Sequence, residues 1–186
     1  QRGCGCTAFS AAIGLASMEQ IQLLLEYGAD VNIGCQSDGK PLQVAIQNRN
    51  WEVAHLLLDR GADTNRCLVF AVQHGANQDF LTALIEKGAR INQTALYGVS
   101  ALSHAAVTRR DMELVQFLLD QGADVNARSA LTGAHSTTPW LKLAADRDVG
   151  VEMVRLFLEH GAAVNDCDQD GNTALMLATS LCFVQE

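Results

Sequence analysis

Five short phrases that begin with glycine recur along the chain, and their spacing constrains the fold more than any other feature. They open at Gly28, Gly61, Gly88, Gly122 and Gly161, which are separated by 33, 27, 34 and 39 residues. Self-similarity at such a period is typical of repeat proteins, in which each unit packs against its neighbours along an array. The sequence therefore predicts a series of similar structural units.

An apolar segment with helical periodicity precedes each glycine. The five segments read IQLLLEY, AHLLLDR, LTALIEK, VQFLLDQ and VRLFLEH. Each places Leu, Ile or Phe at the spacing that faces a core, and glycine just past the last turn is the preferred residue for a left-handed helix cap. Each segment is therefore predicted to be a helix that ends at its glycine.

A shorter helical stretch, rich in small residues, lies upstream of each apolar segment. The five stretches read TAFSAAIGLAS, KPLQVAIQNRN, LVFAVQHGANQ, SALSHAAVTRR and TPWLKLAADRD. Alanine lets neighbouring helices approach closely, and Thr138 before Pro139 is a favourable helix start that Thr7, Ser100 and Thr173 repeat. Each unit is therefore predicted to be a helix–turn–helix, with short turns or hairpins between units.

These motifs resemble the ankyrin repeat family. The family pattern is Thr-Pro-Leu-His-x-Ala-Ala, then Leu-Leu-Leu-x-x-Gly-Ala-Asp-Val-Asn and a hairpin finger with Asp-x-x-Gly-x-Thr; residues 7–32 match it without a gap, and residues 166–178 match a finger and the start of another repeat. The resemblance implies an all-α solenoid of stacked helix-turn-helix units with short β-hairpin fingers. We expect one ankyrin-repeat domain over residues 1–186, with approximate repeats at 7–39, 40–66, 67–99, 100–137 and 138–172 and a partial repeat at 173–186.

Several positions depart from the family pattern. The histidine of the pattern is replaced by Ser10, Gln43, Ser103 and Met176, and Trp140 takes a leucine position that must repack around it. Repeats four and five carry about one extra residue near the turn between their helices, around residues 109–110 and 146–148.

Composition predicts a folded chain with an acidic surface. Hydrophobic residues make up 48% of the 186 residues, and 13 Lys and Arg against 21 Asp and Glu give a net charge of −8. Such a charge disfavours attraction to phosphate backbones and anionic membranes. We therefore expect no nucleic-acid partner, and a basic or apolar protein or peptide instead.

The cysteines and apolar runs predict a compartment. No apolar run approaches the roughly 20 residues that span a bilayer, and the first residues lack a secretory signal, so no membrane insertion is expected. Six irregularly spaced cysteines in a chain with an ample core favour reduced thiols. We expect a cytoplasmic or nuclear protein, and the terminal residues suggest a piece of a longer chain.

Catalytic and cofactor sites are not expected. Asp166, Asp168 and Asp170 before Gly171 resemble the start of a calcium loop, but position twelve is Leu177 and the hairpin finger explains the same residues. Three cysteines near the N-terminus (Cys4, Cys6, Cys35) lack a fourth zinc ligand, and the five histidines lack ligand spacing. We predict no catalytic residue, no metal and no cofactor.

The resemblance implies protein recognition through finger tips and first helices. The finger-tip candidates are Gln36, Ser37, Leu96 and Tyr97, and the first-helix candidates are Gln47, Asn48, Gln73, His74, Val107 and Thr108. Leu96 and Tyr97 either contact a partner or fold onto the adjacent finger. The fourth finger is longer by about four residues, and Arg128 and His135 give it polar reach.

One copy, GADTNRCLVFAV, lacks the polar run that forms a finger. Asn65 leads through Arg66 and Cys67 almost directly into the next helix. A simple loop deletion is one explanation of the missing run. The alternative is that the deletion creates a notch, with Arg66 at its floor, in which a peptide or ligand binds.

The sequence leaves three functions open. The first is a non-enzymatic interaction scaffold that binds a protein through its concave face and finger tips. The second is an ankyrin scaffold adapted to small-molecule binding or catalysis in a pocket at its irregular repeats. The third is a targeting or regulatory segment of a larger enzyme.

We predict that Leu57→Ala or Leu118→Ala loosens two adjoining repeats, because each leucine is placed between helices. Burying such a side chain contributes about 1.5–3 kcal/mol. Chemical denaturation measures the loss, and unchanged stability of both variants would contradict the assigned core.

Overall fold

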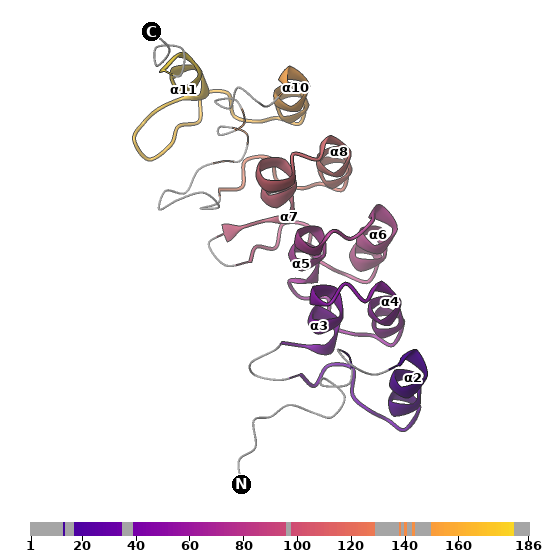
Figure 1. Ribbon diagram of the computed structural model, residues 1–186. Helices are drawn as coiled ribbons and strands as arrows, with labels where there is room; N and C mark the ends of the chain where they lie inside the picture. Colours follow the sequence, from indigo (N-terminus) through magenta and orange to yellow (C-terminus); the bar gives the residue numbers. More distant parts are fainter. Residues whose placement is uncertain are drawn as a thin grey trace. The chain divides into compact units, whose positions relative to one another are not determined.

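A computed structural model describes Ile13, residues 17–34, 39–95 and 98–128, Thr138, Trp140, Leu143 and residues 150–180. Over these residues the fold is all-α, as predicted, and the chain divides into two compact units, residues 1–90 and 91–186 (Figure 1). The elements in order are α2 (Met18–Glu26), α3 (Pro41–Gln47), α4 (Trp51–Asp59), α5 (Cys67–His74), α6 (Gln78–Glu86), α7 (Ala101–Ser103), the π-helix η2 (His104–Arg109), α8 (Met112–Asp120), α10 (Val151–Glu159) and α11 (Ala174–Ser180).

The five recurring glycines end helices, as predicted. Each lies just beyond α2, α4, α6, α8 or α10, with φ between 82° and 95°. After α2, the Gly28 amide donates to the Leu25 carbonyl at 3.1 Å and the Ala29 amide donates to the Leu24 carbonyl at 2.9 Å. Glycine reaches this left-handed conformation without a steric penalty, so it closes the helix and turns the chain away.

Side-chain caps fix where the helices begin. Ser100 accepts a bond from the Ser103 amide at 3.1 Å, which confirms the predicted start of α7. Asn50, Asn77 and Asp111 cap α4, α6 and α8 in the same way. Each cap satisfies an amide that the first turn leaves without a helical partner.

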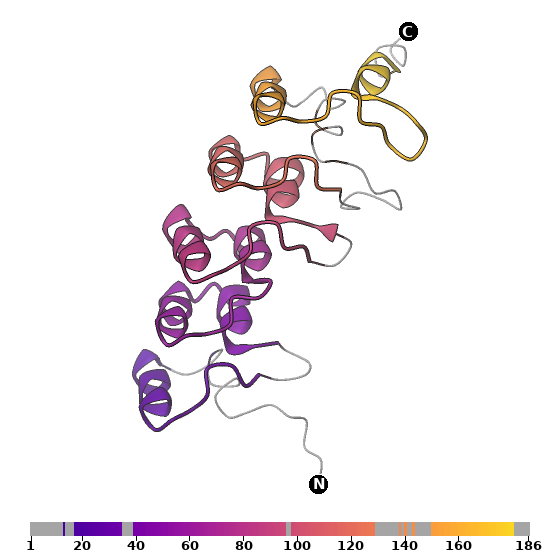
Figure 2. The same cartoon turned by 180° about the vertical axis from the view of Figure 1, so that it is seen from behind.

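The first unit is built from two helix pairs and α2. Helix α3 packs against α4 and α5, while α6 packs against α4 and α5 (Figures 1 and 2). The side chains of Leu42, Ile46, Leu57 and Leu84 are fully buried in this core. Burial of Leu57 agrees with its predicted position between helices.

Aromatic rings fill the junction between α4 and α6. The centroid of the Phe80 ring lies 5.4 Å from that of Trp51 and 4.9 Å from that of His55. Phe80 is fully buried, whereas Trp51 is half-buried and His55 exposed. The two α4 rings therefore cover Phe80 from the solvent side.

In the second unit, α7 and η2 together form one first helix that packs against α8. Leu102, Ala105 and Leu118 are buried in this contact. The six residues of η2 make the wider π-type turn, which accommodates an additional residue within a helix. The extra residue predicted near the turn of this repeat is thus absorbed by the helix itself.

Asparagine side chains link successive turns within each unit. Asn32 Nδ2 donates to the Gly61 carbonyl at 3.4 Å, and Asn32 Oδ1 accepts from the Asp63 amide at 2.7 Å. Asn92 makes the equivalent pair with Gly122 and Asp124, and Asn126 with Gly161 and Ala163. One amide group therefore serves a carbonyl and an N–H of the next turn at the same time.

The described parts of the fingers are short. Thr94 with Ser100, and Cys167 with Thr173, form isolated antiparallel bridges. After Asn65 the chain enters α5 at Cys67, as predicted for the copy that lacks a finger. None of the helices in the described ranges is long and apolar enough to cross a membrane.

A left-handed residue also connects the first and second helices of each described pair. Arg49 follows α3 with φ 55°, Gly75 follows α5 with φ 84°, and Arg110 follows η2 with φ 53°. After α3, the Asn50 amide donates to the Ala45 carbonyl at 2.9 Å, and after α5 the Ala76 amide donates to the Ala71 carbonyl at 2.9 Å. The same turn is therefore made with glycine once and with arginine twice.

We predict that Arg49→Gly stabilises the fold, because an L-residue in the left-handed region carries a steric cost of about 1 kcal/mol that glycine avoids. Glycine also adds backbone freedom to the unfolded state, which offsets part of this gain, so urea denaturation should show a net rise of about 0.5 kcal/mol or less. The control is Arg60→Gly, because Arg60 has φ −88° and carries no left-handed strain. There glycine only adds backbone freedom to the unfolded state, so the substitution should lower stability by about 0.5–1 kcal/mol. Equal effects of the two variants would contradict the strain at Arg49.

Candidate interaction surface

The predicted first-helix residues lie at the ends of their helices. Gln47 is the last residue of α3 and Asn48 follows it, both exposed, whereas Gln73 and His74 at the end of α5 are half-buried. In the second unit, Val107 is half-buried and Thr108 is exposed within η2. The first-unit candidates lie on two helices in direct contact, so they belong to adjoining parts of one surface. The predicted finger-tip residues Gln36, Ser37, Leu96 and Tyr97, and His135 of the long finger, lie outside the described residues.

Phe70 joins this surface although the sequence reasoning missed it. Its side chain is half-buried, and its ring centroid lies 6.4 Å from that of His74, one helical turn later. His74 Nδ1 lies 2.8 Å from the Phe70 carbonyl. Because a carbonyl only accepts, Nδ1 carries a proton in this contact. The four-residue spacing between Phe70 and His74, which places both side chains on one face of a helix, is the sequence signal that could have identified Phe70.

The place of the missing finger is occupied by contacts from the preceding repeat. Lys40, just before α3, forms an ion pair with Asp63. Gln43 Nε2 donates to the Asn65 carbonyl at 3.1 Å. Arg66 then takes a left-handed conformation, with φ 62°, before α5 begins. The short connection is thus held by side chains from α3 and its N-terminal flank, and the exposed Arg66 is presented beside them.

Two ionisable groups at this connection have shifted pKa values. The hydrogen bond from Lys40, together with the Asn65 amide, lowers the pKa of Asp63 below its ordinary value of 3.8. Burial, reinforced by the nearby Asp63 carboxylate, raises the pKa of the Cys67 thiol to about 12. A thiol with so high a pKa is not a nucleophile at neutral pH, so Cys67 is a core residue in which reactivity is suppressed.

Arg128, predicted to reach toward a partner, contacts the next finger. Its Nη1 lies 3.4 Å from Asp166 Oδ1, and its Nη2 donates to the Cys167 carbonyl at 2.9 Å. Thr138 Oγ1 donates to the second carboxylate oxygen of Asp166 at 3.2 Å. Arg128 therefore helps to position the finger of residues 166–173, and a role in binding stays a prediction.

Asp168 of that finger uses its side-chain oxygens within the turn. Asp168 Oδ1 accepts from the Asp170 amide at 3.0 Å and from the Asn172 amide at 2.8 Å, while Asp168 Oδ2 accepts from Asn172 Nδ2 at 3.2 Å. Across the described ranges, no group of three His, Cys, Asp or Glu side chains is arranged to hold a metal ion.

Comparison with known proteins gives a consistent family. A family model described as ankyrin repeats, in three copies, matches residues 1–67 and 65–129. Human ankyrin repeat and SOCS box protein 6 is 32% identical over 136 residues, which cover 73% of this chain and 27% of that protein. The mouse B-cell lymphoma 3 protein homolog is 30% identical over 146 residues, which cover 78% of this chain and 25% of that protein. The chain therefore spans about a quarter of the length of these relatives.

Solved structures agree on the fold. The crystal structure of the ankyrin repeat domain of Bcl-3 superimposes with a TM-score of 0.76 at 25% identity, over 97% of this chain and 82% of that one. A chain in the complex of the Bd0816 endopeptidase and immunity protein Bd3460 from Bdellovibrio bacteriovorus gives a TM-score of 0.73 at 19% identity, over 96% of this chain and 93% of that one. The second likeness concerns the fold alone.

We predict that Asp63→Asn lowers stability at neutral pH and has little effect in acid. A carboxylate whose pKa is depressed by folding stabilises the folded state above its unfolded pKa, near 3.8, and that contribution is lost as pH falls through the lower folded pKa. Both side chains of the pair are more than a third exposed, at 42% and 37%, so the neutral-pH loss should stay below about 1 kcal/mol. Urea denaturation of both proteins from pH 7 to pH 2.5 measures it. Asp30→Asn, the matching change in the preceding turn, leaves the Lys40 ion pair intact and should not reproduce the effect.

Proposed function

We propose that this chain, which belongs to the ankyrin-repeat family, binds a protein or peptide partner through the faces of its first helices. Ankyrin-repeat domains are generally protein–protein interaction modules. The observation that carries the finer proposal is the division of α5: five of its eight residues are buried, and the remaining three form one accessible strip. That strip is Phe70, Gln73 and His74.

The chemistry of the strip suits a peptide. Aromatic side chains provide large contact areas at low entropic cost and recur at interface hot spots. The Gln73 amide both donates and accepts, and His74 can form a hydrogen bond through Nε2, so the two can pair with a peptide backbone. Gln47 at the end of the adjoining α3 extends the same polar edge. This surface favours a peptide that places an apolar residue against Phe70 and makes backbone hydrogen bonds to the side-chain amides of Gln73 and Gln47.

The ion pair at the missing finger further favours a peptide over an enclosed small molecule. Lys40 and Gln43 already contact Asp63 and the Asn65 carbonyl across the short connection. These contacts hold the short connection in place before α5. An extended segment of a partner could therefore reach Arg66 and Phe70 without meeting a finger.

We predict that Gln73→Ala combined with His74→Ala reduces recovery of the partner by about tenfold, because several partly buried contacts would be lost together. The experiment is affinity capture followed by quantitative mass spectrometry, with wild type and variant at matched concentration and matched circular dichroism.

The matched control is Gln22→Ala with Gln78→Ala, which removes exposed amides from α2 and α6. This variant should retain the partner. Recovery that is unchanged in the α5 variant, or reduced equally in the control, would reject the first-helix face as the binding site.

A further inference from the structure

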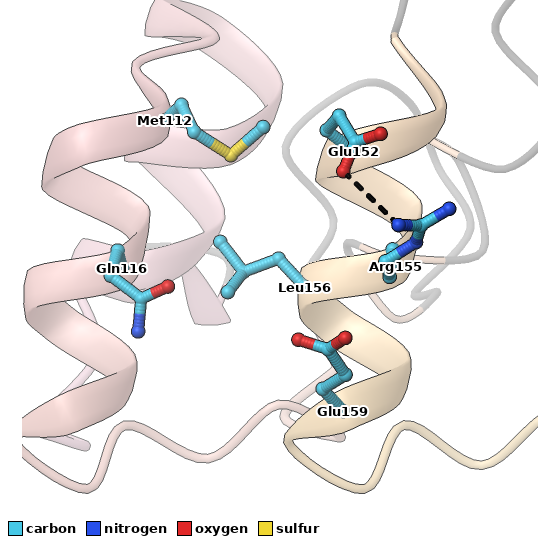
Figure 3. Close-up of a pocket in the computed structure, with 6 residues that line it drawn as sticks. All are labelled: Met112, Gln116, Glu152, Arg155, Leu156 and Glu159. Atoms are coloured by element: carbon cyan, nitrogen blue, oxygen red, sulfur yellow. Dashed lines mark ion pairs between the residues drawn. The ribbon is translucent and has the colours of Figure 1, made fainter.

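A groove lies between the second helices α8 and α10 of the second unit. Its volume is about 270 Å³, and Met112 and Gln116 of α8 line one wall, while Glu152, Arg155, Leu156 and Glu159 of α10 line the other (Figure 3). Leu156 is 7% exposed and points across toward α8, so it forms an apolar floor. The groove therefore combines one apolar contact region with charged rims.

The α8 wall of the groove carries different side chains from those at the same positions of α4. Met112 and Gln116 are the first and fifth residues of α8, the places held in α4 by Trp51 and His55. At the α4–α6 junction those two rings cover Phe80. In α8 these positions carry a flexible thioether and an amide, and Met112 remains 37% exposed.

Acceptor atoms from both helices converge on the groove. Gln116 Nε2 donates to Asp120 Oδ1 at 2.8 Å, which fixes the amide so that its carbonyl oxygen is the end left for another donor. The Glu159 carboxylate points from α10 toward Gln116 (Figure 3). Glu152 lies 3.7 Å from Arg155, both largely exposed, so Arg155 neutralises the other rim carboxylate. Glu159 and the Gln116 carbonyl therefore offer a negatively charged corner with two acceptor groups beside the Leu156 floor.

The size of the groove limits what it can take. Pockets for small organic ligands usually enclose about 300–1,000 Å³, and 270 Å³ in an open groove is smaller. One long side chain from a partner fits this scale. Arginine and lysine carry an apolar stem that packs on hydrophobic surface and a cationic head that remains at the polar rim.

We propose that the α8–α10 groove is a second docking surface, which receives an arginine or lysine side chain from a basic segment of a partner protein. The stem lies on Leu156 and Met112, and the cationic head donates to the Glu159 carboxylate and the Gln116 carbonyl. Charge complementarity selects this occupant, because the rim carries two carboxylates against one guanidinium and the whole chain is acidic. The proposal does not depend on binding at α5, since different helices form the two surfaces.

The test uses an N-acetylated, C-amidated peptide of sequence Gly-Leu-Arg-Leu-Gly and its citrulline analogue, titrated into the isotopically labelled chain. We expect the arginine peptide to shift the NMR signals of the Gln116 side-chain amide and of α8 and α10 backbone amides. The neutral citrulline peptide should bind about fivefold more weakly, the scale of one partly exposed ion pair. Equal binding of both peptides, or shifts outside these helices, would overturn the proposal.

Two variants separate the groove from general charge attraction. Glu159→Gln should weaken binding of the arginine peptide by about fivefold. Glu86→Gln, the same change at the last residue of α6, should leave this binding unchanged. Met112→Trp with Gln116→His installs the α4 side chains and should close the groove and abolish the shifts. Similar losses in Glu159→Gln and Glu86→Gln would mean nonspecific attraction and would overturn the site. Unchanged partner recovery in the Gln73→Ala, His74→Ala variant, with these peptide results intact, would reject only the first-helix proposal.

Discussion

The asparagine bridge between successive turns is the interaction on which the arrangement of each unit depends. One side-chain amide donates to the carbonyl of a helix-ending glycine and accepts an amide two residues later in the next repeat. These two bonds set the register between neighbouring turns, because both atoms of the amide must be satisfied together. The buried leucines supply most of the stabilising free energy, but they tolerate small shifts that the paired hydrogen bonds do not. The register in turn decides which first-helix residues lie side by side on α3 and α5.

Much of this fold could be predicted from local signals. A glycine after an apolar helical run fixed the end of each second helix, and the shortened copy correctly predicted that α5 follows Asn65 almost directly. Other features depend on contacts that a local pattern does not contain. Asn32 and Gly61 meet although 29 positions separate them, and η2 absorbs an extra residue that the sequence could place only within a position or two. The boundaries of the repeats remain predictions.

The candidate surfaces were predicted less completely than the fold. Gln73 and His74 were proposed by counting from the repeat phrase, whereas Phe70 was not proposed because an aromatic residue inside an apolar helix resembles a core residue. Arg128 contacts Asp166 and the Cys167 carbonyl, and its role in binding stays a prediction. The α8–α10 groove was not predicted, because it depends on which side chains of two helices more than 30 residues apart face each other.

The copy without a finger shows how separable the parts of a repeat are. The connection through Arg66 is short, yet Asn32 still bridges to Gly61 and Asp63, and α3 still packs against α5. Helix stacking and loop length are therefore set by different residues. The peptide bond between Asn65 and Arg66 is accordingly a natural insertion point, where a foreign loop could be grafted while the helices keep their contacts. Binding specificity can then change through one loop at a time, while the packing of the helices in the core stays the same.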